Sequence, residues 1–297
     1  MKHKKVIIGG GITGLVLSYY LDLPIVCNPE DIGGQLSAKD WHLGPRFLQV
    51  DSWSERLLDD LNLSKKQEEI TIGFDNDGAC IKDDEFRQKY FEKTRKTKDG
   101  FVASSLSGGN DSFKSFKVSL TEIISELKDA LMSKKNMLIP NMVTNIDVKG
   151  KVLALDNGET IEYDEVISTI PASVFNKIST VKLKGEFKCL PKVFVLTDVT
   201  PNWDFTYKYF AGSEDFHRVT KQDGKCVVEY TDFTPDEMDS EIDRATLWVG
   251  QIQENEEVNI LEGIQFVGRY AEWRHNFLIN DAVKAALVIG NNHERTK

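Results

Sequence analysis

The glycine-rich loop near the start of the chain is the feature that most constrains its fold. The apolar run Lys5-Val6-Ile7-Ile8 leads directly into Gly9-Gly10-Gly11-Ile12-Thr13-Gly14. A strand followed by G-x-G-x-x-G and a helix is the dinucleotide-binding fingerprint. Gly9 allows a tight turn, Gly11 lets the backbone approach a pyrophosphate, and Gly14 lets the helix pack closely on the sheet. The pattern therefore predicts a pyrophosphate site at a helix N-terminus.

The residues after this loop favour a binding site over a glycine turn that binds nothing. Residues 15–21 are apolar enough for a buried helix, Pro24 ends it, and Ile25-Val26-Cys27 is typical of a second short strand. A strand, a helix and a strand within thirty residues form the expected βαβ unit. A second glycine pair, Gly33-Gly34, follows it.

Several separated segments resemble the flavin amine oxidase, protoporphyrinogen oxidase and UDP-galactopyranose mutase superfamily. Gly33-Gly34-Gln35 resembles its Gly-Gly pair, and Leu43-Gly44-Pro45-Arg46-Phe47 resembles the segment that passes near the flavin ring. Residues 156–171 resemble the family's return strand, and residues 267–282 resemble its C-terminal FAD segment. The matching segments occur in the family's order over roughly half of the chain.

This resemblance implies non-covalently bound FAD and a set of cofactor contacts. Where the family usually has a ribose-binding glutamate, this chain has Asn28, with Glu30 two residues later. Asparagine can accept a hydrogen bond but carries no charge. The cofactor-binding residues implied are Gly9, Gly10, Gly11, Ile12, Thr13, Gly14, Asn28, Glu30, Gly33, Gly34, Gln35, Val143 (near adenine), Gly268, Arg269, Ile279 and Asn280.

Composition excludes several other classes of protein. The chain has 297 residues, 40% of them hydrophobic, and a formal net charge of −10, which argues against a general nucleic-acid surface. It has no apolar run of 18 residues, and its start leads into a strand, so we expect neither a membrane span nor a secretory signal. Four widely spaced cysteines and five histidines favour reduced thiols, a cytoplasmic location and no metal site.

The predicted fold is α/β, with a Rossmann-like FAD-binding domain of parallel sheet and helices and an inserted antiparallel-sheet substrate domain. Residues 1–75, 116–172 and 262–297 are assigned to the FAD-binding domain, residues 76–115 to a mobile or helical insertion, and residues 173–261 to the substrate domain. Within the last of these, residues 193–196, 207–210 and 225–230 are strand-like and aromatic.

Five residues are candidates for contact with a substrate. Arg218, in Phe216-His217-Arg218-Val219, resembles an arginine that faces a substrate phosphate in the mutase-like members; a surface arginine is the alternative. His217 beside it is a substrate contact or an ordinary strand histidine. His42 and Arg46 flank the segment expected under the flavin ring, where Arg46 either stabilises a reduced flavin or pairs with the region of Asp51. Trp273 is a wall of the site or a core residue.

The preferred function is that of an FAD-dependent oxidoreductase of the amine oxidase type, which transfers a hydride from a small-molecule substrate to flavin. No general base is identifiable. The alternatives are a UDP-galactopyranose mutase-like isomerase, a flavin enzyme that modifies aminoacylated pyrimidines in viral DNA (a substrate linked to nucleic acid), and a non-catalytic flavin-binding scaffold. The substrate, the electron acceptor and the oligomeric state are left open.

Overall fold

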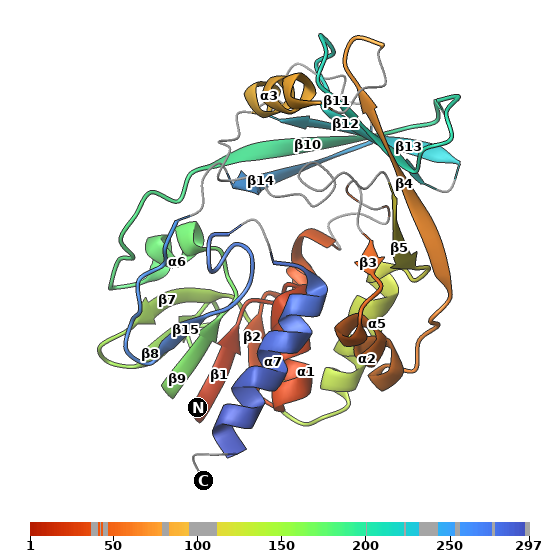
Figure 1. Ribbon diagram of the computed structural model, residues 1–297. Helices are drawn as coiled ribbons and strands as arrows, with labels where there is room; N and C mark the ends of the chain where they lie inside the picture. Colours follow the sequence, from red (N-terminus) through yellow and green to blue (C-terminus); the bar gives the residue numbers. More distant parts are fainter. Residues whose placement is uncertain are drawn as a thin grey trace.

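A computed structural model describes residues 1–36, 41, 43, 47–78, 83–94, 112–199, 201–222, 224–231, 243–252, 256–274 and 277–294. The described chain forms two sheets with helices against them (Figure 1). The helices are α1 (Ile12–Leu21), α2 (Ser52–Asp60), α3 (Asp84–Lys93), α5 (Leu120–Met132), α6 (Ala172–Ile178) and α7 (Ile279–Glu294).

The first sheet has seven strands and a parallel centre. It consists of β1 (Lys2–Ile8), β2 (Ile25–Cys27), β6 (Leu138–Pro140), β7 (Val143–Asp147), β8 (Val152–Leu155), β9 (Thr160–Ser168) and β15 (Ile264–Phe266). Strands β6, β2, β1 and β9 pair in parallel in that order, and β15 pairs in parallel with β9. The antiparallel strands β8 and β7 extend the sheet from β9.

Both faces of this sheet are covered. Because alternate strand residues point to opposite sides, one strand contributes side chains to two separate cores. On one face, Ile7 and Ile25 join a core formed with α1, α2, α5 and α7. On the other, Val6 and Ile8 join a core formed with α6, β7 and β8. Helices α1 and α7, which are far apart in sequence, lie side by side (Figure 1).

The second sheet has eight strands. They are β3 (Leu48–Gln49), β4 (Gln67–Asp75), β5 (Ser112–Phe116), β10 (Cys189–Thr197), β11 (Tyr207–Phe210), β12 (Arg218–Gln222), β13 (Lys225–Thr231) and β14 (Arg244–Ile252). Their order is β14-β10-β13-β12-β11-β4-β5-β3, and every pair is antiparallel except β11 with β4. Helix α3 packs on one face through Phe86 and Tyr90.

The predicted α/β class, with a parallel nucleotide-type sheet and a largely antiparallel second sheet, is confirmed. The strands expected around residues 193–196, 207–210 and 225–230 are β10, β11 and β13. The second sheet, however, also contains β3, β4 and β5, which lie outside residues 173–261. The proposed domain boundaries remain a prediction, and this sheet includes strands from both sides of them. The segment predicted as a mobile or helical insertion, residues 76–115, contains helix α3 and the start of strand β5, so residues 112–115, which we expected in a loop over residues 104–115, form a strand instead. Residues 79–82 and 95–111 lie outside the described residues.

Candidate functional site

The glycine loop lies between β1 and α1 and is closed by the second glycine pair. Gly33 N donates to Gly10 O at 2.7 Å, and Gly11 and Gly33 form an isolated parallel bridge. Gly9 and Gly34 have positive φ angles of 105° and 59°, which glycine adopts without strain. A Cβ on Gly34 would lie 3.2 Å from Gly11 Cα, so the two segments meet too closely for a side chain there.

Two glycines of the fingerprint differ in what surrounds them. A Cβ on Gly14 would lie 2.0 Å from Gly9 O, so Gly14 is required for the close contact between helix and loop. A Cβ on Gly11 would meet no atom of the described residues within 4 Å. Gly11 is also the N-cap of α1, where no side chain caps the helix and the first turn contains no acidic residue. An uncapped helix N-terminus with free space beside Gly11 is an arrangement that favours an anion.

The C-terminal segment reaches the same loop from the other end of the chain. Gly268 has a φ of 114°, and a Cβ there would lie 3.2 Å from Thr13 Cγ2. The next residue, Arg269, has a buried Nε with no hydrogen-bond partner among the described residues. The unpaired guanidinium N–H of Arg269, the residue that follows Gly268 in the chain, is a donor suited to a phosphate ligand.

Asn28, Glu30 and Val143 follow the carboxyl ends of parallel strands β2 and β6, next to the glycine loop at the end of β1. Nucleotides bind at this edge of such sheets. The Asn28 Oδ1 accepts from Glu30 N at 3.1 Å and so caps a short 3₁₀ turn, while Glu30 is exposed. Asn28, the residue that follows β2, therefore stabilises the turn that it begins. A ribose contact from either residue remains a prediction.

Other predicted cofactor residues connect elements. Gln35 Nε2 donates to Val249 O in β14 at 2.7 Å, which joins the glycine-pair segment to the second sheet. Asn280 Nδ2 donates to the Asp51 carboxylate, which caps α2, and Ile279 is half-buried against the core. The side chain of Asn280 is thus used to join α7 to α2, and its cofactor role stays a prediction. Ile12 is half-buried against the same core.

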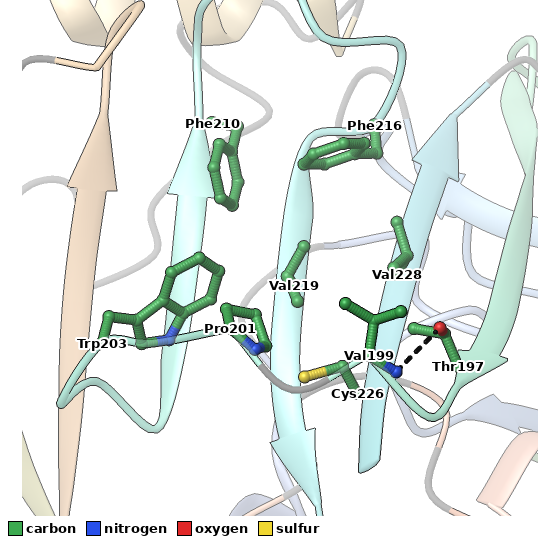
Figure 2. A pocket seen from close by; sticks show the side chains of 9 residues that line it. All are labelled: Thr197, Val199, Pro201, Trp203, Phe210, Phe216, Val219, Cys226 and Val228. Carbon is green, nitrogen blue, oxygen red and sulfur yellow. Dashed lines mark hydrogen bonds between the residues drawn. The ribbon is translucent and has the colours of Figure 1, made fainter.

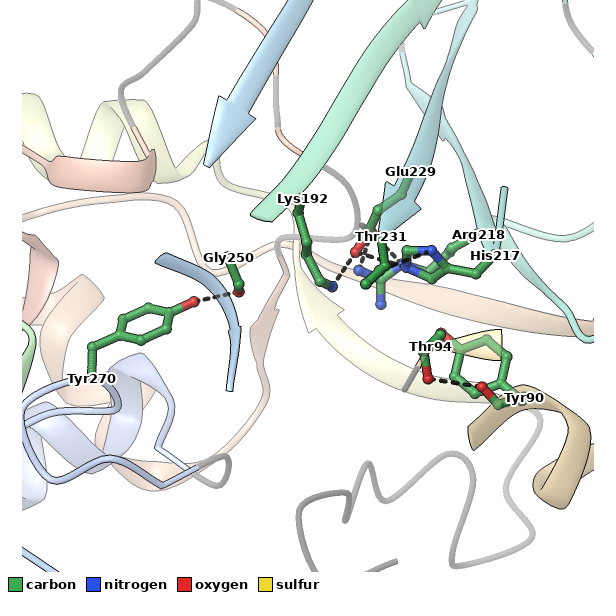
Figure 3. A network of polar contacts seen from close by, with 9 residues as sticks. All are labelled: Tyr90, Thr94, Lys192, His217, Arg218, Glu229, Thr231, Gly250 and Tyr270. Carbon is green, nitrogen blue, oxygen red and sulfur yellow. Dashed lines mark hydrogen bonds and ion pairs between the residues drawn. The ribbon is translucent and has the colours of Figure 1, made fainter. Parts of the chain in front are cut away.

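A buried ionic cluster lies on the face of the second sheet that carries α3 (Figure 3). At its centre, Glu229 of β13 is 1% exposed. Its carboxylate accepts from Arg218 Nε at 2.7 Å, pairs with Lys192 of β10, and lies 3.1 Å from His217 Nε2. The Arg218 guanidinium stands 5.6 Å from the centroid of the Tyr209 ring.

Burial and charge set the protonation states in this cluster. Burial lowers the pKa of His217 to about 3, against the opposing effect of Glu229. The Arg218 and Lys192 cations hold the pKa of Glu229 well below its usual range despite burial. At neutral pH the cluster therefore has two cations, one carboxylate and a neutral imidazole.

Sequence reasoning found Arg218 and His217 and missed Lys192 and Glu229. Both lie in apolar strand segments, Pro191-Lys192-Val193 and Val228-Glu229-Tyr230. A charged residue within a buried strand was the available signal, because such residues are rarely buried without a partner.

The remaining predicted substrate contacts separate into two groups. Trp273 is fully buried in the core with Val6 and Phe175, and its ring packs edge-on against Phe187. Of the two roles expected for Trp273, the structure therefore shows that of a core residue, and we do not include Trp273 among the substrate contacts. His42 and Arg46 lie outside the described residues.

The C-terminal segment of the first layer contacts the second sheet at strand β14. The Tyr270 hydroxyl, in the segment that follows β15 of the first sheet, donates to Gly250 O in β14 at 2.9 Å. A Cβ on Gly250 would lie 2.7 Å from the backbone N of Lys192. The C-terminal segment that follows Gly268 therefore contacts the strand beside Lys192 (Figure 3). The described residues contain no group of three side chains arranged to hold a metal, and none of their helices could cross a membrane.

A parallel sheet with a glycine loop at its carboxyl edge, joined to a second, mostly antiparallel sheet, is the architecture of the FAD-binding Rossmann-type oxidoreductases. A scan against protein-family models and a search of curated protein sequences give no match. Solved structures of similar fold are numerous, and they include enzymes of the superfamily that the sequence resembles.

Three of these structures indicate the degree of likeness. Reduced UDP-galactopyranose mutase has a TM-score of 0.68 and 13% identity over 99% of this chain and 96% of that one. Wild-type putrescine oxidase bound to putrescine has a TM-score of 0.66 and 12% identity, covering 99% of both chains. Cyclohexylamine oxidase from Brevibacterium oxydans has a TM-score of 0.67 and 11% identity over 98% of this chain and 99% of that one. The chain therefore has the same fold as these flavin-dependent enzymes.

Proposed function

We propose that this protein is an FAD-dependent oxidoreductase whose glycine loop binds the FAD pyrophosphate. The observation that carries the proposal is the open space at Gly11, at an uncapped helix N-terminus that Gly33 and Gly268 approach from separate parts of the chain. The unpaired Arg269 Nε supplies a further donor for a phosphate oxygen. The other contacts that the resemblance implies remain part of this proposal. They come from residues 9–14 and 33–35 and from Gly268, Arg269, Ile279 and Asn280.

The flavin, when bound, supplies an acceptor for a hydride from a substrate C–H, which we place next to nitrogen as in an amine oxidase. The protein binds the substrate, orients it and excludes water. We assign the substrate contacts to the cluster face of the second sheet, where Arg218 and Lys192 have side chains 15% and 13% exposed. These partly accessible cations can orient a polar group, while Glu229 and neutral His217 are fully enclosed behind them.

A second candidate is a mutase-like isomerase acting on a sugar nucleotide. The observation that favours it is Arg218 itself, a cation on the substrate sheet of a type that grips phosphate groups. Both candidates need the same cofactor, and they differ in the redox state in which the enzyme is active.

The cofactor proposal is tested by replacing Gly11, whose backbone φ of −67° any residue can adopt. We expect Gly11→Ala to fold normally and to bind FAD at least tenfold more weakly, because the new methyl group occupies the space proposed for the pyrophosphate. Gly290→Ala is the matched control, since its Cβ would make only an ordinary 3.6 Å contact with Leu21 in α7's packing against α1. FAD titration of the apoproteins, followed by flavin fluorescence, gives the affinities. If both variants bind FAD equally well, the loop does not bind the pyrophosphate. If the wild type takes up no FAD, the proposal of an FAD-dependent enzyme is wrong.

The reaction type is tested on the wild-type holoprotein by flavin absorbance. Bleaching of the flavin absorbance by an added amine under anaerobic conditions supports oxidase chemistry. Tight binding of a UDP-sugar that requires prior reduction with dithionite supports the mutase instead. If neither treatment has an effect, the assignment of both reactions is wrong.

A further inference from the structure

The two segments that close the glycine loop also hold one short stretch of the second sheet. Gln35, which follows the second glycine pair, donates to Val249 O at 2.7 Å, and Tyr270, in the segment after β15, donates to Gly250 O at 2.9 Å. Both acceptors lie in β14, the edge strand of that sheet. Carbonyls of consecutive residues in a regular strand point to opposite edges, so the backbone of β14 is irregular where these two donors meet it.

The irregularity is a β-bulge in β14. Between the pair Leu190 with Gln251 and the pair Lys192 with Leu247, β10 contributes one residue and β14 contributes three. The single residue of β10 is Pro191, which has no N–H to donate across the bulge. Bulges are frequent next to active sites, where they bend a strand and redirect side chains.

Gly250 brings the bulge against the backbone of Lys192. A Cβ on Gly250 would lie 2.7 Å from Lys192 N and 2.9 Å from Lys192 Cβ, so a larger residue would force the two strands apart. Lys192 in turn pairs with the buried Glu229 carboxylate of the ionic cluster (Figure 3). Tyr270 is therefore linked, through one backbone carbonyl, to the strand that carries a cation of the cluster.

The cluster and an apolar groove occupy opposite faces of the second sheet. Arg218 and Glu229 face each other in the register of β12 with β13. The next pair, Val219 with Val228, points to the other side of the sheet. There the valines line the groove, and none of the described residues that line it is charged (Figure 2). The polar contacts proposed for a substrate therefore belong to the cluster face, where the position of Lys192 affects them.

We propose that Tyr270 and Gln35 are positioning residues, which act through the β14 bulge to set the place of Lys192 relative to the bound cofactor. This inference rests on the FAD site proposed above. FAD that holds the second glycine pair and the segment after β15 against the loop fixes both donors, and so holds the bulge and β10 in one arrangement. Binding of FAD then orders the cluster face before a substrate arrives, which lowers the entropy cost of binding that substrate.

Hydrogen–deuterium exchange of the full chain, with and without added FAD, tests this inference. In the wild type we expect FAD to slow exchange in α1, and to slow it about tenfold in β10 and β14, while β4 at the far side of the sheet is unchanged. Tyr270→Phe removes only the hydroxyl, so FAD should still protect α1. The FAD effect in β10 and β14 should fall to about twofold, because one hydrogen bond changes a local opening equilibrium about fivefold.

Tyr163→Phe is the matched control. The Tyr163 hydroxyl donates to Asp147 O at 3.3 Å within the first sheet, so its loss removes a tyrosine hydrogen bond that does not reach β14. The FAD effect on β10 and β14 should equal that of the wild type. FAD titration of each variant establishes that its site is saturated during exchange.

A purely structural role for Tyr270 gives a different result. It would speed exchange in β10 and β14 equally with and without FAD, and so leave the FAD effect at its wild-type value. That result, or protection of α1 without protection of β10 and β14 in the wild type, would overturn this inference and leave the FAD site in place. Loss of FAD binding in Tyr270→Phe would also overturn it, by placing the hydroxyl on the cofactor. If FAD protects no part of the wild type, α1 included, the proposed function is wrong and this inference falls with it.

Discussion

At the scale of single residues, Glu229 holds the ionic cluster together. Its carboxylate is 1% exposed and contacts Arg218, Lys192 and His217. A buried charge is tolerated only when it is paired, and here two cations share one carboxylate. The charge balance of this part of the second sheet therefore depends on Glu229.

Replacing Glu229 by glutamine should destabilise the protein strongly. Glu229→Gln keeps the shape but leaves Arg218 and Lys192 without a counter-charge, which costs about 3–5 kcal/mol for a buried pair. Lys225→Ala is the comparison. It removes the cation of an exposed ion pair at the start of β13, where the side chains of Lys225 and Asp198 are 52% and 87% exposed, and should cost less than about 1 kcal/mol. Urea unfolding measures both free energies. A cost for Glu229→Gln no larger than that for Lys225→Ala would show that the cluster is not a stabilising unit.

His217 should make the stability of the protein depend on pH. Its pKa is lowered to about 3 in the folded protein, whereas the unfolded chain protonates near pH 6.5. Between these values the unfolded state binds more protons, so the free energy of unfolding falls as the pH is lowered. From pH 7 to pH 5 this single group accounts for about 2 kcal/mol.

The variant His217→Gln should lose this part of the pH dependence. Urea unfolding at pH 7, 6 and 5 is therefore expected to give a smaller decrease for the variant than for the wild type, by about 2 kcal/mol over the range. If both proteins lose stability equally, the folded-state imidazole titrates like that of the unfolded chain, and the cluster differs from its description above.

At the scale of elements, the helix termini show how local signals and distant contacts combine. Asp51 is the N-cap of α2, where its side chain accepts from Ser54 N at 2.7 Å. The same carboxylate accepts from Asn280 at the start of α7. One residue therefore both begins a helix and holds the first turn of a second helix against it.

This double role gives a prediction for Asp51→Ala. Loss of an N-cap costs about 1 kcal/mol, and loss of the acceptor for Asn280 adds about 1 kcal/mol. Asp83→Ala is the control, because Asp83 caps α3 in the same way, accepting from Phe86 N at 2.8 Å. We expect urea unfolding to show the larger loss for Asp51→Ala. A loss equal to that of Asp83→Ala would mean that the contact with Asn280 contributes nothing.

Elements with a clear local pattern were predicted well. Leu120, Ile123, Ile124, Leu127 and Leu131 have the spacing of one face of an amphipathic helix, and in α5 all five side chains are buried. The strand-like segments of the second sheet became β10, β11 and β13. Which strands would pair with them could not be predicted from the sequence, because the parallel pairing of β4 with β11 joins residues more than a hundred positions apart.

At the scale of the whole molecule, the proposed FAD site joins three distant parts of the chain. Residues 9–14, 33–34 and 268–269 meet at the N-terminus of α1, and α7 then packs along α1. A ligand bound at this junction stabilises only the folded state, in which the three segments are together.

FAD should therefore raise the stability of the entire first layer. At a free concentration one hundred times the Kd, binding adds about 2.7 kcal/mol to the free energy of unfolding. The shift is measured by urea unfolding of the apoprotein with and without FAD. Gly11→Ala should show a much smaller shift at the same FAD concentration, and an equal shift in both proteins would place FAD away from the loop.

The sequence alone determined the glycine loop and the βαβ unit that contains it, and from these it predicts the class of ligand. These depend on backbone geometry within about thirty residues, which glycines at fixed spacing specify directly. Only the tertiary structure decided that Glu229 joins Lys192 to Arg218, that Asn280 binds Asp51, and that Trp273 belongs to the core. Each of these follows from strand register or helix packing, and a shift of one residue would turn the side chain to the other face.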